Sequence, residues 1–174
     1  MDIILAVAAL CIAAPVMLLV SALLSGQGLG HVIFIQERLG RHGKRFNLYK
    51  FRKFPPHWKT EGAAVTVAKD PRRTRIGAIL ERTKLDELPQ FWNILKGDMT
   101  LVGPRPELPY FFDLLVGRYR AVLDYTPGLF GPSSIPDECD SYPLDEDPET
   151  YYRRVLFPRK AELDLAYYPT ANTL

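Results

Sequence analysis

Two neighbouring carboxylates and one arginine are the side chains whose types and spacing could do chemistry. Asp86 and Glu87 are adjacent, and Arg105 follows within the Gly-Pro-Arg-Pro segment Gly103–Pro106. Each proline fixes its own φ and restricts the residue before it, so the backbone on both sides of Arg105 should be rigid. A carboxylate pair with a rigidly presented guanidinium could handle a phosphate group. A surface helix followed by a proline-rich turn accounts for the same residues equally well.

A short amphipathic helix is expected to position the carboxylates near its start. Its apolar positions recur at helical spacing and should bury one side: Leu85, Leu88, Phe91 and Leu95. Lys96–Gly97 should end the helix, because Gly97 can take the left-handed cap conformation. Adjacent helical residues point about 100° apart. Asp86 and Glu87 therefore cannot chelate a metal as a flat clamp.

The amino-terminal segment Ile3–Leu24 is an uncharged run of 22 residues. As a straight helix it would be roughly 33 Å long, enough to cross the hydrocarbon core of a membrane. Pro15, near its middle, removes one backbone hydrogen bond and should bend the helix. Hydropathy leaves two geometries open, a tilted span and a bent helix that returns to the same face. A buried helix of a soluble protein is the third alternative.

Charge is distributed unevenly along the chain, although the net charge is only +2, too small to imply nucleic acid. Residues 38–59 contain eight basic side chains and no acidic one, whereas residues 137–149 contain seven acidic side chains and no basic one. This asymmetry favours a positive face for phosphates or anionic lipid over two ordinary solvated faces. Cys11 and Cys139, with three scattered histidines, show neither metal-ligand spacing nor a disulfide framework.

Five further elements are expected along the chain. Residues 43–52 alternate as a strand does, which would place Lys50 and Arg52 on one face. A helix should begin with Asp70 as its N-cap and Pro71 at its first position. Short amphipathic helices are predicted over residues 110–115 and 119–123, and a last helix should begin at Asp147.

Three stretches at fixed spacing resemble the signature of the bacterial sugar transferases: Leu85–Gln90, Asn93–Met99 and Val102–Glu107. The Tyr-Lys-Phe-Arg run at residues 49–52 also matches this family, and the likeness extends from about Ile3 to about Tyr168. These proteins are monotopic phosphoglycosyl transferases, which load a sugar phosphate onto a polyprenol phosphate carrier. A long run of identities at fixed spacing is a strong signal.

The resemblance implies an α+β fold that is mostly helical with little strand. Residues 1–30 would form a re-entrant membrane helix, broken at Pro15, and its exit turn. Residues 31–174 would form one small catalytic domain with interfacial amphipathic helices. The domain is expected on the cytoplasmic face of the bacterial inner membrane, in agreement with the basic cluster that follows the apolar run. The sequence leaves open whether the protein is a homo-oligomer.

The resemblance also implies roles for particular residues. Asp86 would attack a nucleotide diphosphosugar, expected to be a UDP-sugar, release UMP and pass the phosphosugar to polyprenol phosphate, expected to be undecaprenol phosphate. Glu87 would help Asp86 to hold Mg²⁺ or manage a proton. The substrate phosphates would be bound by basic side chains: Arg105, Lys50, Arg52 and Arg82.

The sequence departs from the family pattern at three places. Many relatives carry arginine where this chain has Glu81, most carry one near the segment Ser133–Glu138, and a Lys-Arg pair usually precedes the position of Asp2. Two other functions therefore remain open. One is a membrane-bound, Mg²⁺-dependent hydrolase of diphosphate compounds, and the other is a non-catalytic partner in a glycan assembly complex.

Overall fold

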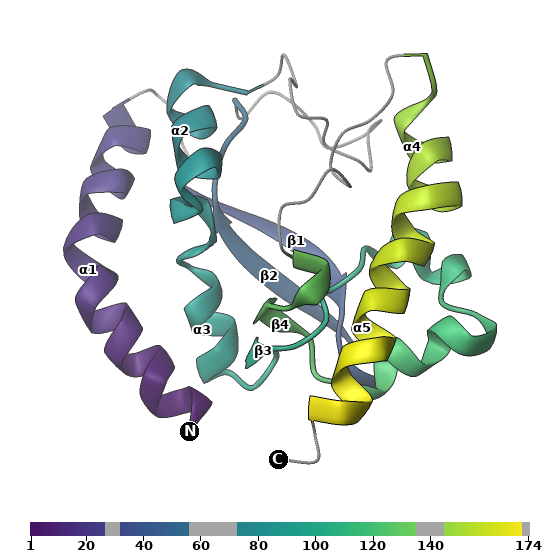
Figure 1. Ribbon diagram of the computed structural model, residues 1–174. Helices are drawn as coiled ribbons and strands as arrows, with labels where there is room; N and C mark the ends of the chain where they lie inside the picture. The colour runs from purple at the N-terminus through teal and green to yellow at the C-terminus, as the bar shows by residue number, and fades with distance from the viewer. Residues whose placement is uncertain (27–31, 56–72, 135–144, 172–174) are drawn as a thin grey trace. The chain divides into compact units, whose positions relative to one another are not determined.

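The structure is a computed structural model that describes residues 1–26, 32–55, 73–134 and 145–171, and it divides into two units (Figure 1). The first unit comprises Met1–Gln36, Asn47–Lys59 and Pro71–Asp98, and the second comprises Glu37–Phe46, Thr60–Asp70 and Met99–Leu174. The described chain is mostly helical with few strands, as the resemblance implies.

Helix α1, Asp2–Gly26, contains almost all of the apolar run. It is assigned as a single helix through Pro15, and Figure 1 draws it as one bowed coil. A break at Pro15 therefore stays a prediction. Among the described residues, α1 is the one helix that is long and apolar enough to cross a membrane, by length and composition alone.

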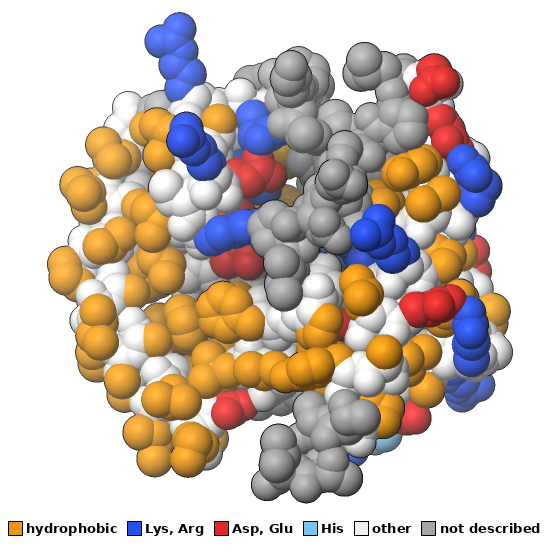
Figure 2. All heavy atoms as spheres, viewed as in Figure 1, with side chains coloured by type: hydrophobic (Ala, Val, Ile, Leu, Met, Phe, Trp, Pro, Cys, Tyr) orange, Lys and Arg blue, Asp and Glu red, His pale blue; other side chains and the backbone are white. Residues whose placement is uncertain are grey.

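Most side chains of α1 are exposed, which a core helix of a soluble protein would not allow. Ile12 is 79% exposed and Leu18 is 71% exposed, and Figure 2 shows hydrophobic side chains gathered over α1 along the left edge of the view. A few side chains near its carboxyl end are buried against the rest of the first unit. Val20 and Leu24 join a small core with Phe51 and Leu80.

Strands β1, Ile33–Leu39, and β2, Arg45–Phe51, form a two-stranded sheet joined by the 3₁₀ turn η1, Arg41–Gly43. The Gly40 amide donates to the Lys44 carbonyl, and the Arg52 amide donates to the Val32 carbonyl, so the strands run antiparallel. The predicted strand over residues 43–52 is confirmed.

The buried side chain of Asn93 fixes β2 to the following helical segment. Its Oδ1 accepts from the Tyr49 amide at 3.1 Å, and its Nδ2 donates to the Asn47 carbonyl at 2.7 Å. The amide side chain therefore pairs with the strand edge as a neighbouring strand would.

Helix α2, Arg75–Thr83, begins later than the sequence predicts. Thr74 is its N-cap, with extended backbone and a hydroxyl that accepts from the Gly77 amide. The start predicted at Pro71 is wrong for this reason. Pro71 and the proposed cap Asp70 lie outside the described residues.

The predicted amphipathic helix around Asp86 is two shorter pieces, the 3₁₀ turn η2, Leu85–Glu87, and helix α3, Gln90–Leu95. Pro89 has no N–H to donate to the Leu85 carbonyl, which instead accepts from the Leu88 amide. The expected apolar stripe is only half-buried. The side chains buried deepest on this segment include Asp86, Gln90 and Asn93. Gly97, at φ +78°, follows the end of α3 as predicted.

In the second unit, strands β3, Thr100–Val102, and β4, Gly128–Phe130, pair in parallel, with Thr100 opposite Gly128. The two backbones approach so closely after β3 that a Cβ on Gly128 would lie 2.0 Å from the Gly103 amide nitrogen. Glycine is therefore required at this crossing.

The remaining elements of the second unit are helical. The segments predicted over residues 110–115 and 119–123 are the 3₁₀ helices η3, Pro109–Leu114, and η4, Gly117–Asp124, and η5 covers Pro132–Ser134. Helix α4, Pro148–Tyr151, continues through a π-helical turn, Tyr152–Leu156, into α5, Phe157–Ala171. Asp147 caps α4 through the Thr150 amide, as predicted.

The core of the second unit consists of apolar side chains from these helices and from the end of β1: Leu39, Phe111, Leu115, Tyr152, Leu156, Phe157 and Ala161. The predicted exit turn after Gly26 and the departure at residues 135–138 lie outside the described residues.

Candidate functional site

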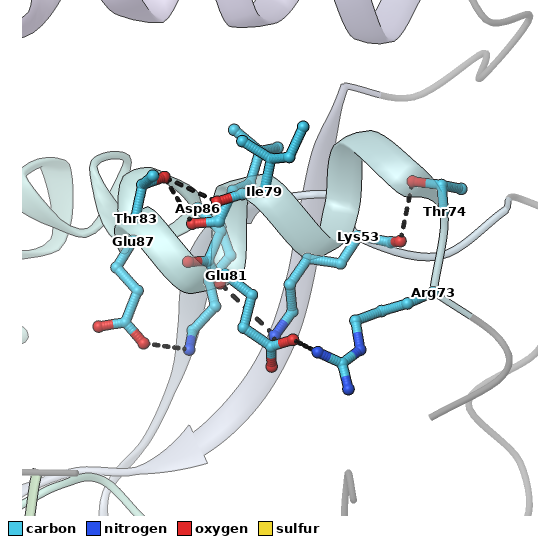
Figure 3. A network of polar contacts seen from close by, with 10 residues as sticks. Lys53, Arg73, Thr74, Ile79, Glu81, Thr83, Asp86 and Glu87 are labelled. Carbon is cyan, nitrogen blue, oxygen red and sulfur yellow. Dashed lines mark hydrogen bonds and ion pairs between the residues drawn. The ribbon is translucent and has the colours of Figure 1, made fainter. Parts of the chain in front are cut away.

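A network of carboxylates and cations surrounds Asp86 in the first unit. The Lys53 ammonium lies 3.6 Å from Asp86 Oδ2 and 2.8 Å from Glu81 Oε1, and Glu81 also accepts a hydrogen bond from Arg73. Figure 3 shows the Lys53 ammonium beside Glu81, with Arg73 on the far side of that carboxylate. Two cations and two carboxylates thus alternate in space, although Lys53 and Glu81 are 28 positions apart in the chain.

Helix α2 holds Lys53 by its backbone as well as by its side chain. The Lys53 carbonyl accepts from the Thr74 amide at 3.1 Å and from the Thr74 hydroxyl at 3.3 Å. A Cβ on Gly77 would lie 2.2 Å from that carbonyl oxygen, so only glycine permits the approach. Thr74, Gly77 and Glu81 have the three- and four-residue spacing that places them on one side of a helix.

The chain reverses direction between α2 and η2 at Lys84, which has a left-handed backbone with φ 59°. This conformation is uncommon for a residue with a side chain. The reversal allows Glu81, before it, and Asp86, after it, to reach the same lysine.

Asp86 is buried, with 2% of its surface exposed, and its Oδ1 has no hydrogen-bond partner in the part of the chain that is described. Burial raises the pKa of Asp86 above its ordinary value, and the nearby Lys53 and Lys50 ammonium groups oppose that rise. The neighbouring Glu87 and Glu81 carboxylates add to the increase in pKa. A carboxylate with one oxygen that accepts no hydrogen bond and a cation near the other can act as a nucleophile once a substrate reaches it.

Glu87 forms a separate ion pair with Lys50. The Lys50 ammonium lies 2.9 Å from Glu87 Oε1, and both side chains are largely buried. The structure thus brings together three of the residues predicted from the sequence, namely Asp86, Glu87 and Lys50.

The ion pairs given above do not include two other predicted residues. Arg52, just after β2, has its guanidinium carbon 5.9 Å from the centre of the Phe34 ring, in cation–π geometry. Arg82, on α2, is exposed and takes no part in the ion pairs given above.

Arg105 belongs to the second unit, where its backbone is held on both sides. The Pro104 carbonyl accepts from the Gly128 amide at 2.9 Å, and the Pro106 carbonyl accepts from the Arg38 guanidinium at 3.0 Å. Arg105 and Asp86 belong to different units, so a site that both residues share stays a prediction.

Sequence reasoning missed Lys53 and Arg73 as members of the site. Lys53 was one of eight basic residues in a cluster, and Arg73 one of several near the start of a helix. The sequence signal that could have singled out Lys53 is Glu81, an acidic residue five positions before Asp86. Two carboxylates that close together favour a cation from elsewhere in the chain.

The residues present fit a divalent cation only in part. No group of three or more His, Cys, Asp or Glu side chains that could hold a metal occurs among the described residues. Asp86 Oδ1 is a buried carboxylate oxygen without a hydrogen-bond partner among the described residues, whereas Glu87 Oε1 already accepts from Lys50. Such a donor set suits Mg²⁺, which commonly takes one or two carboxylates and completes its coordination with substrate phosphates and water.

A second buried aspartate lies in the other unit. Asp164, on α5, is 4% exposed, and burial raises its pKa to about 6. Hydrogen bonding from Ser133 and the charge of Lys160 offset part of the rise, while Glu107 adds to it. The Tyr168 hydroxyl lies nearby, and its pKa is raised by burial and by the charge of Asp164.

Comparison with known proteins relates the chain to one family. The model of a family described as "Bacterial sugar transferase" matches residues 1–174. A protein of Bacillus subtilis (strain 168), named as a candidate undecaprenyl-phosphate N-acetylgalactosaminyl 1-phosphate transferase, is 48% identical over 111 residues, which cover 64% of this chain and 62% of that protein.

Two further relatives are longer than this chain. The Aeromonas hydrophila "UDP-N-acetylgalactosamine-undecaprenyl-phosphate N-acetylgalactosaminephosphotransferase" is 42% identical over 150 residues, 84% of this chain and 35% of that protein. The Escherichia coli (strain K12) "UDP-glucose:undecaprenyl-phosphate glucose-1-phosphate transferase" is 41% identical over 137 residues, 77% of this chain and 30% of that protein. The chain thus spans about a third of the length of these two relatives.

Proposed function

This chain belongs to the bacterial sugar transferase family, and we propose that it transfers a sugar 1-phosphate from a nucleotide diphosphosugar to polyprenol phosphate. The relatives' names support a UDP-sugar as the donor and undecaprenol phosphate as the acceptor. The observation that carries the proposal is the buried Asp86 carboxylate, with one oxygen that has no hydrogen-bond partner among the described residues and the Lys53 ammonium 3.6 Å from the other.

In the first half-reaction, an oxygen of ionised Asp86 attacks the phosphorus that bears the sugar. The bond from that phosphorus to the bridging oxygen breaks, and its electron pair leaves with the nucleoside monophosphate, UMP for a UDP-sugar. The product is a phosphosugar joined to Asp86 as an acyl phosphate. Burial of Asp86 supports this step, because it keeps water from the acyl phosphate.

In the second half-reaction, an oxygen of polyprenol phosphate attacks the same phosphorus. The bond between phosphorus and the Asp86 oxygen breaks, which restores the carboxylate and yields a polyprenyl diphosphosugar. No water is consumed, and no net proton transfer is required. Two half-reactions at one nucleophile predict ping-pong kinetics.

Mg²⁺ would be held by Asp86 and Glu87 together with the substrate phosphates, and when bound it would neutralise charge on the diphosphate. Lys50 already pairs with Glu87 Oε1, so Glu87 would become a ligand through its other oxygen or after the Lys50–Glu87 pair opens. Arg105, Arg52 and Arg82 remain proposed phosphate contacts. A guanidinium suits this role, since it can make paired hydrogen bonds to phosphate oxygens.

The proposed reaction joins a water-soluble donor to a lipid acceptor, so it requires a position at the membrane surface. The exposed apolar surface of α1 supports membrane insertion, and Pro15 supports a bent, re-entrant path. We infer that both ends of α1 face the cytoplasm and that the catalytic residues lie at the cytoplasmic face of the inner membrane.

A donor panel tests the proposal. Protein in lipid nanodiscs would be incubated with Mg²⁺, undecaprenol phosphate and UDP-N-acetylgalactosamine, UDP-galactose or UDP-glucose, the sugars in relatives' names. The proposal predicts release of UMP, not UDP, with turnover that requires the polyprenol phosphate and is lost in Asp86→Asn. Release of UMP with water as the acceptor would indicate a hydrolase. No release with any donor would indicate a non-catalytic partner.

A further inference from the structure

We propose that Tyr152 is a positioning residue for Arg105. Its hydroxyl holds the side chain of Glu107, which follows the Gly-Pro-Arg-Pro segment, and thereby fixes the end of the segment that carries the arginine. The inference rests on the proposed function for its effect on catalysis, because Arg105 is there a phosphate contact. The structural part concerns the second unit alone, to which all three residues belong.

The first argument is the hydrogen bond itself. The Tyr152 hydroxyl donates to Glu107 Oε1 at 2.6 Å, although the two residues are 45 positions apart in the chain. Hydrogen bonds from a hydroxyl to a carboxylate are short and roughly twice as strong as those between neutral groups. Tyr152 is only 8% exposed, so water has little access to its side of this contact. The bond is therefore strong enough to restrain Glu107.

The second argument is that the ring bearing this hydroxyl is itself fixed. The Tyr152 ring belongs to the core of the second unit, with its centre 4.7 Å from that of Phe111 and 6.5 Å from that of Phe157. The Lys160 ammonium lies 5.9 Å from the centre of the same ring, in cation–π geometry. A polar group positions a neighbour best when packing has already fixed its own rotamer.

The third argument is the π-helical turn that begins at Tyr152, between α4 and α5 (Figure 1). The Phe157 amide donates to the Tyr152 carbonyl, five positions earlier, and Pro158 has no amide hydrogen to donate. This turn contains one residue more than an α-helical turn, so the buried face advances from Leu156 to Phe157 and continues at Ala161. Tyr152 and α5 thus face the same core. Single π-helical turns occur frequently at functional sites.

The fourth argument is how closely Glu107 is coupled to Arg105. The Glu107 carbonyl accepts from the Leu39 amide at 2.8 Å, so its main chain and its side chain are both held. Pro106 alone separates the two residues, and its ring fixes its φ, so a shift of Glu107 moves the arginine. A guanidinium binds phosphate through paired hydrogen bonds that require a defined orientation. A misplacement of about 1 Å in such a contact can slow a reaction about 100-fold.

The direct test needs no substrate. The Leu39 amide donates to the Glu107 carbonyl, so its rate of hydrogen exchange reports whether Glu107 is held. Exchange would be followed by NMR of ¹⁵N-labelled protein in micelles. Tyr152→Phe keeps the ring in the core and removes the hydroxyl, and it should speed exchange of the Leu39 amide about 10-fold. The Tyr49 amide, bonded to Asn93 in the first unit, should keep its rate. An unchanged Leu39 rate would overturn the inference.

Tyr119→Phe is the matched control. The Tyr119 hydroxyl also donates to a glutamate, Glu162, at 3.2 Å, and its ring packs edge-on against Phe157 of the same core. The substitution therefore removes the same kind of contact from the same unit without touching the segment that carries Arg105. Exchange of the Leu39 amide and the kinetics of donor use should both match those of the wild type.

Glu107 provides a second pair of variants, which is needed if Tyr152→Phe does not fold by circular dichroism. Glu107→Leu removes the acceptor of the same hydrogen bond and should speed Leu39 exchange as Tyr152→Phe does. Glu107→Gln keeps an acceptor oxygen for the tyrosine hydroxyl and should retain most of the protection. Equal exchange rates in Glu107→Leu and Glu107→Gln would overturn the inference, because they would show that the hydrogen bond is not what holds the segment.

The kinetic test asks whether Tyr152 acts through Arg105. UMP release would be measured as the donor concentration is varied, and Tyr152→Phe should lower kcat/KM about 10-fold. In an Arg105→Ala background, the same substitution should cause little further loss, because the group that it positions is already gone. An equal loss of kcat/KM in both backgrounds would overturn the inference, since it would show that Tyr152 acts independently of Arg105.

The two tests separate failure of the inference from failure of the proposed function. If the wild type releases no UMP with any donor, the proposed function fails, and Leu39 exchange still decides whether Tyr152 holds the segment. If the wild type turns over and Tyr152→Phe has unchanged kinetics, only the inference fails, whatever the exchange rate.

Discussion

Asp86 and Asp164 are the two buried aspartates among the described residues, and their surroundings differ. Each has one buried oxygen without a hydrogen-bond partner among the described residues, and Asp86 has the Lys53 ammonium 3.6 Å from its other oxygen. Asp164 has Ser133 and Tyr168 as neighbours and an elevated pKa of about 6. Folding favours the neutral form of a carboxyl group whose pKa it raises. The ionised form of Asp164 should therefore lower the free energy of unfolding.

Replacement of Asp164 by asparagine tests this cost. The folded-state pKa of about 6 exceeds the ordinary value of 3.8, so the wild type loses stability as the pH rises through 6. At pH 8, Asp164→Asn should be more stable by up to about 3 kcal/mol, and the gain should disappear near pH 4. Thermal unfolding in detergent from pH 4 to 8 measures it. If the gain in stability is the same at every pH, the charge of Asp164, which lies near Glu107 and Lys160, is not its cause.

At the residue scale, the sequence identified the carboxylate pair and Lys50 but not the cation nearest to Asp86. The reason is physical. Local spacing indicates which residues share one element, whereas Lys53 meets Glu81 only after a loop and a helix intervene. The rigid backbone predicted at Arg105 stays a prediction, and the carbonyls of the prolines on both sides of it accept hydrogen bonds.

At the scale of elements, α2 holds Lys53 in place, and this role is as important as the stability of the helix itself. Gly77 is buried within the helix, where glycine is ordinarily less favourable than alanine by about 1 kcal/mol. The contact with the Lys53 carbonyl explains its presence, because a Cβ there would lie 2.2 Å from that oxygen. For Gly77→Ala, helix propensity thus predicts a more stable protein, whereas packing predicts a less stable one.

Gly77→Ala should destabilise the protein despite the better helix propensity of alanine. Overpacking of this kind typically costs about 1–3 kcal/mol, more than the propensity returns. UMP release should fall as well, since Lys53 moves with its backbone. The exposed Ala78 provides the control, because Ala78→Gly should cost up to about 1 kcal/mol without slowing release. A Gly77→Ala protein that is both more stable and fully active would contradict the close contact.

The sequence predicted the type of most elements correctly, but it predicted their boundaries and their buried faces less well. The strand over residues 43–52 and the helix capped by Asp147 follow from local pattern and are confirmed. The helix around Asp86 was expected to be continuous with an apolar face. It is divided at Pro89, and its buried side chains include the polar Asn93 and Asp86 beside Ile94, because Asn93 and Asp86 make tertiary contacts that periodicity does not reveal.

At the scale of the whole molecule, α1 leaves a large apolar surface exposed in the described chain. Exposed apolar side chains at this density are characteristic of a lipid contact. The proposed reaction requires the catalytic residues at the cytoplasmic face, and a re-entrant α1 would leave Asp2 on that face too. A spanning α1 would place Asp2 on the opposite side of the membrane.

Single-cysteine labelling tests the path of α1. In a background with Cys11→Ser and Cys139→Ser, cysteines at Asp2 and at the exposed Lys44 would be exposed to a membrane-impermeant maleimide in inside-out and right-side-out vesicles. The re-entrant path predicts that Asp2→Cys and Lys44→Cys are both labelled in inside-out vesicles. Labelling of the two positions in opposite vesicle types would show that α1 spans the membrane.

The central claim is that Asp86 carries the sugar phosphate between donor and lipid, and a stalled reaction tests it most directly. Protein would be incubated with the active UDP-sugar in the absence of polyprenol phosphate, and the intact chain and its peptides would be weighed by mass spectrometry. The account predicts one sugar phosphate on the peptide that contains Asp86, absent in Asp86→Asn and discharged when undecaprenol phosphate is added. Turnover with no such adduct at any time, or an adduct on another residue, would contradict it.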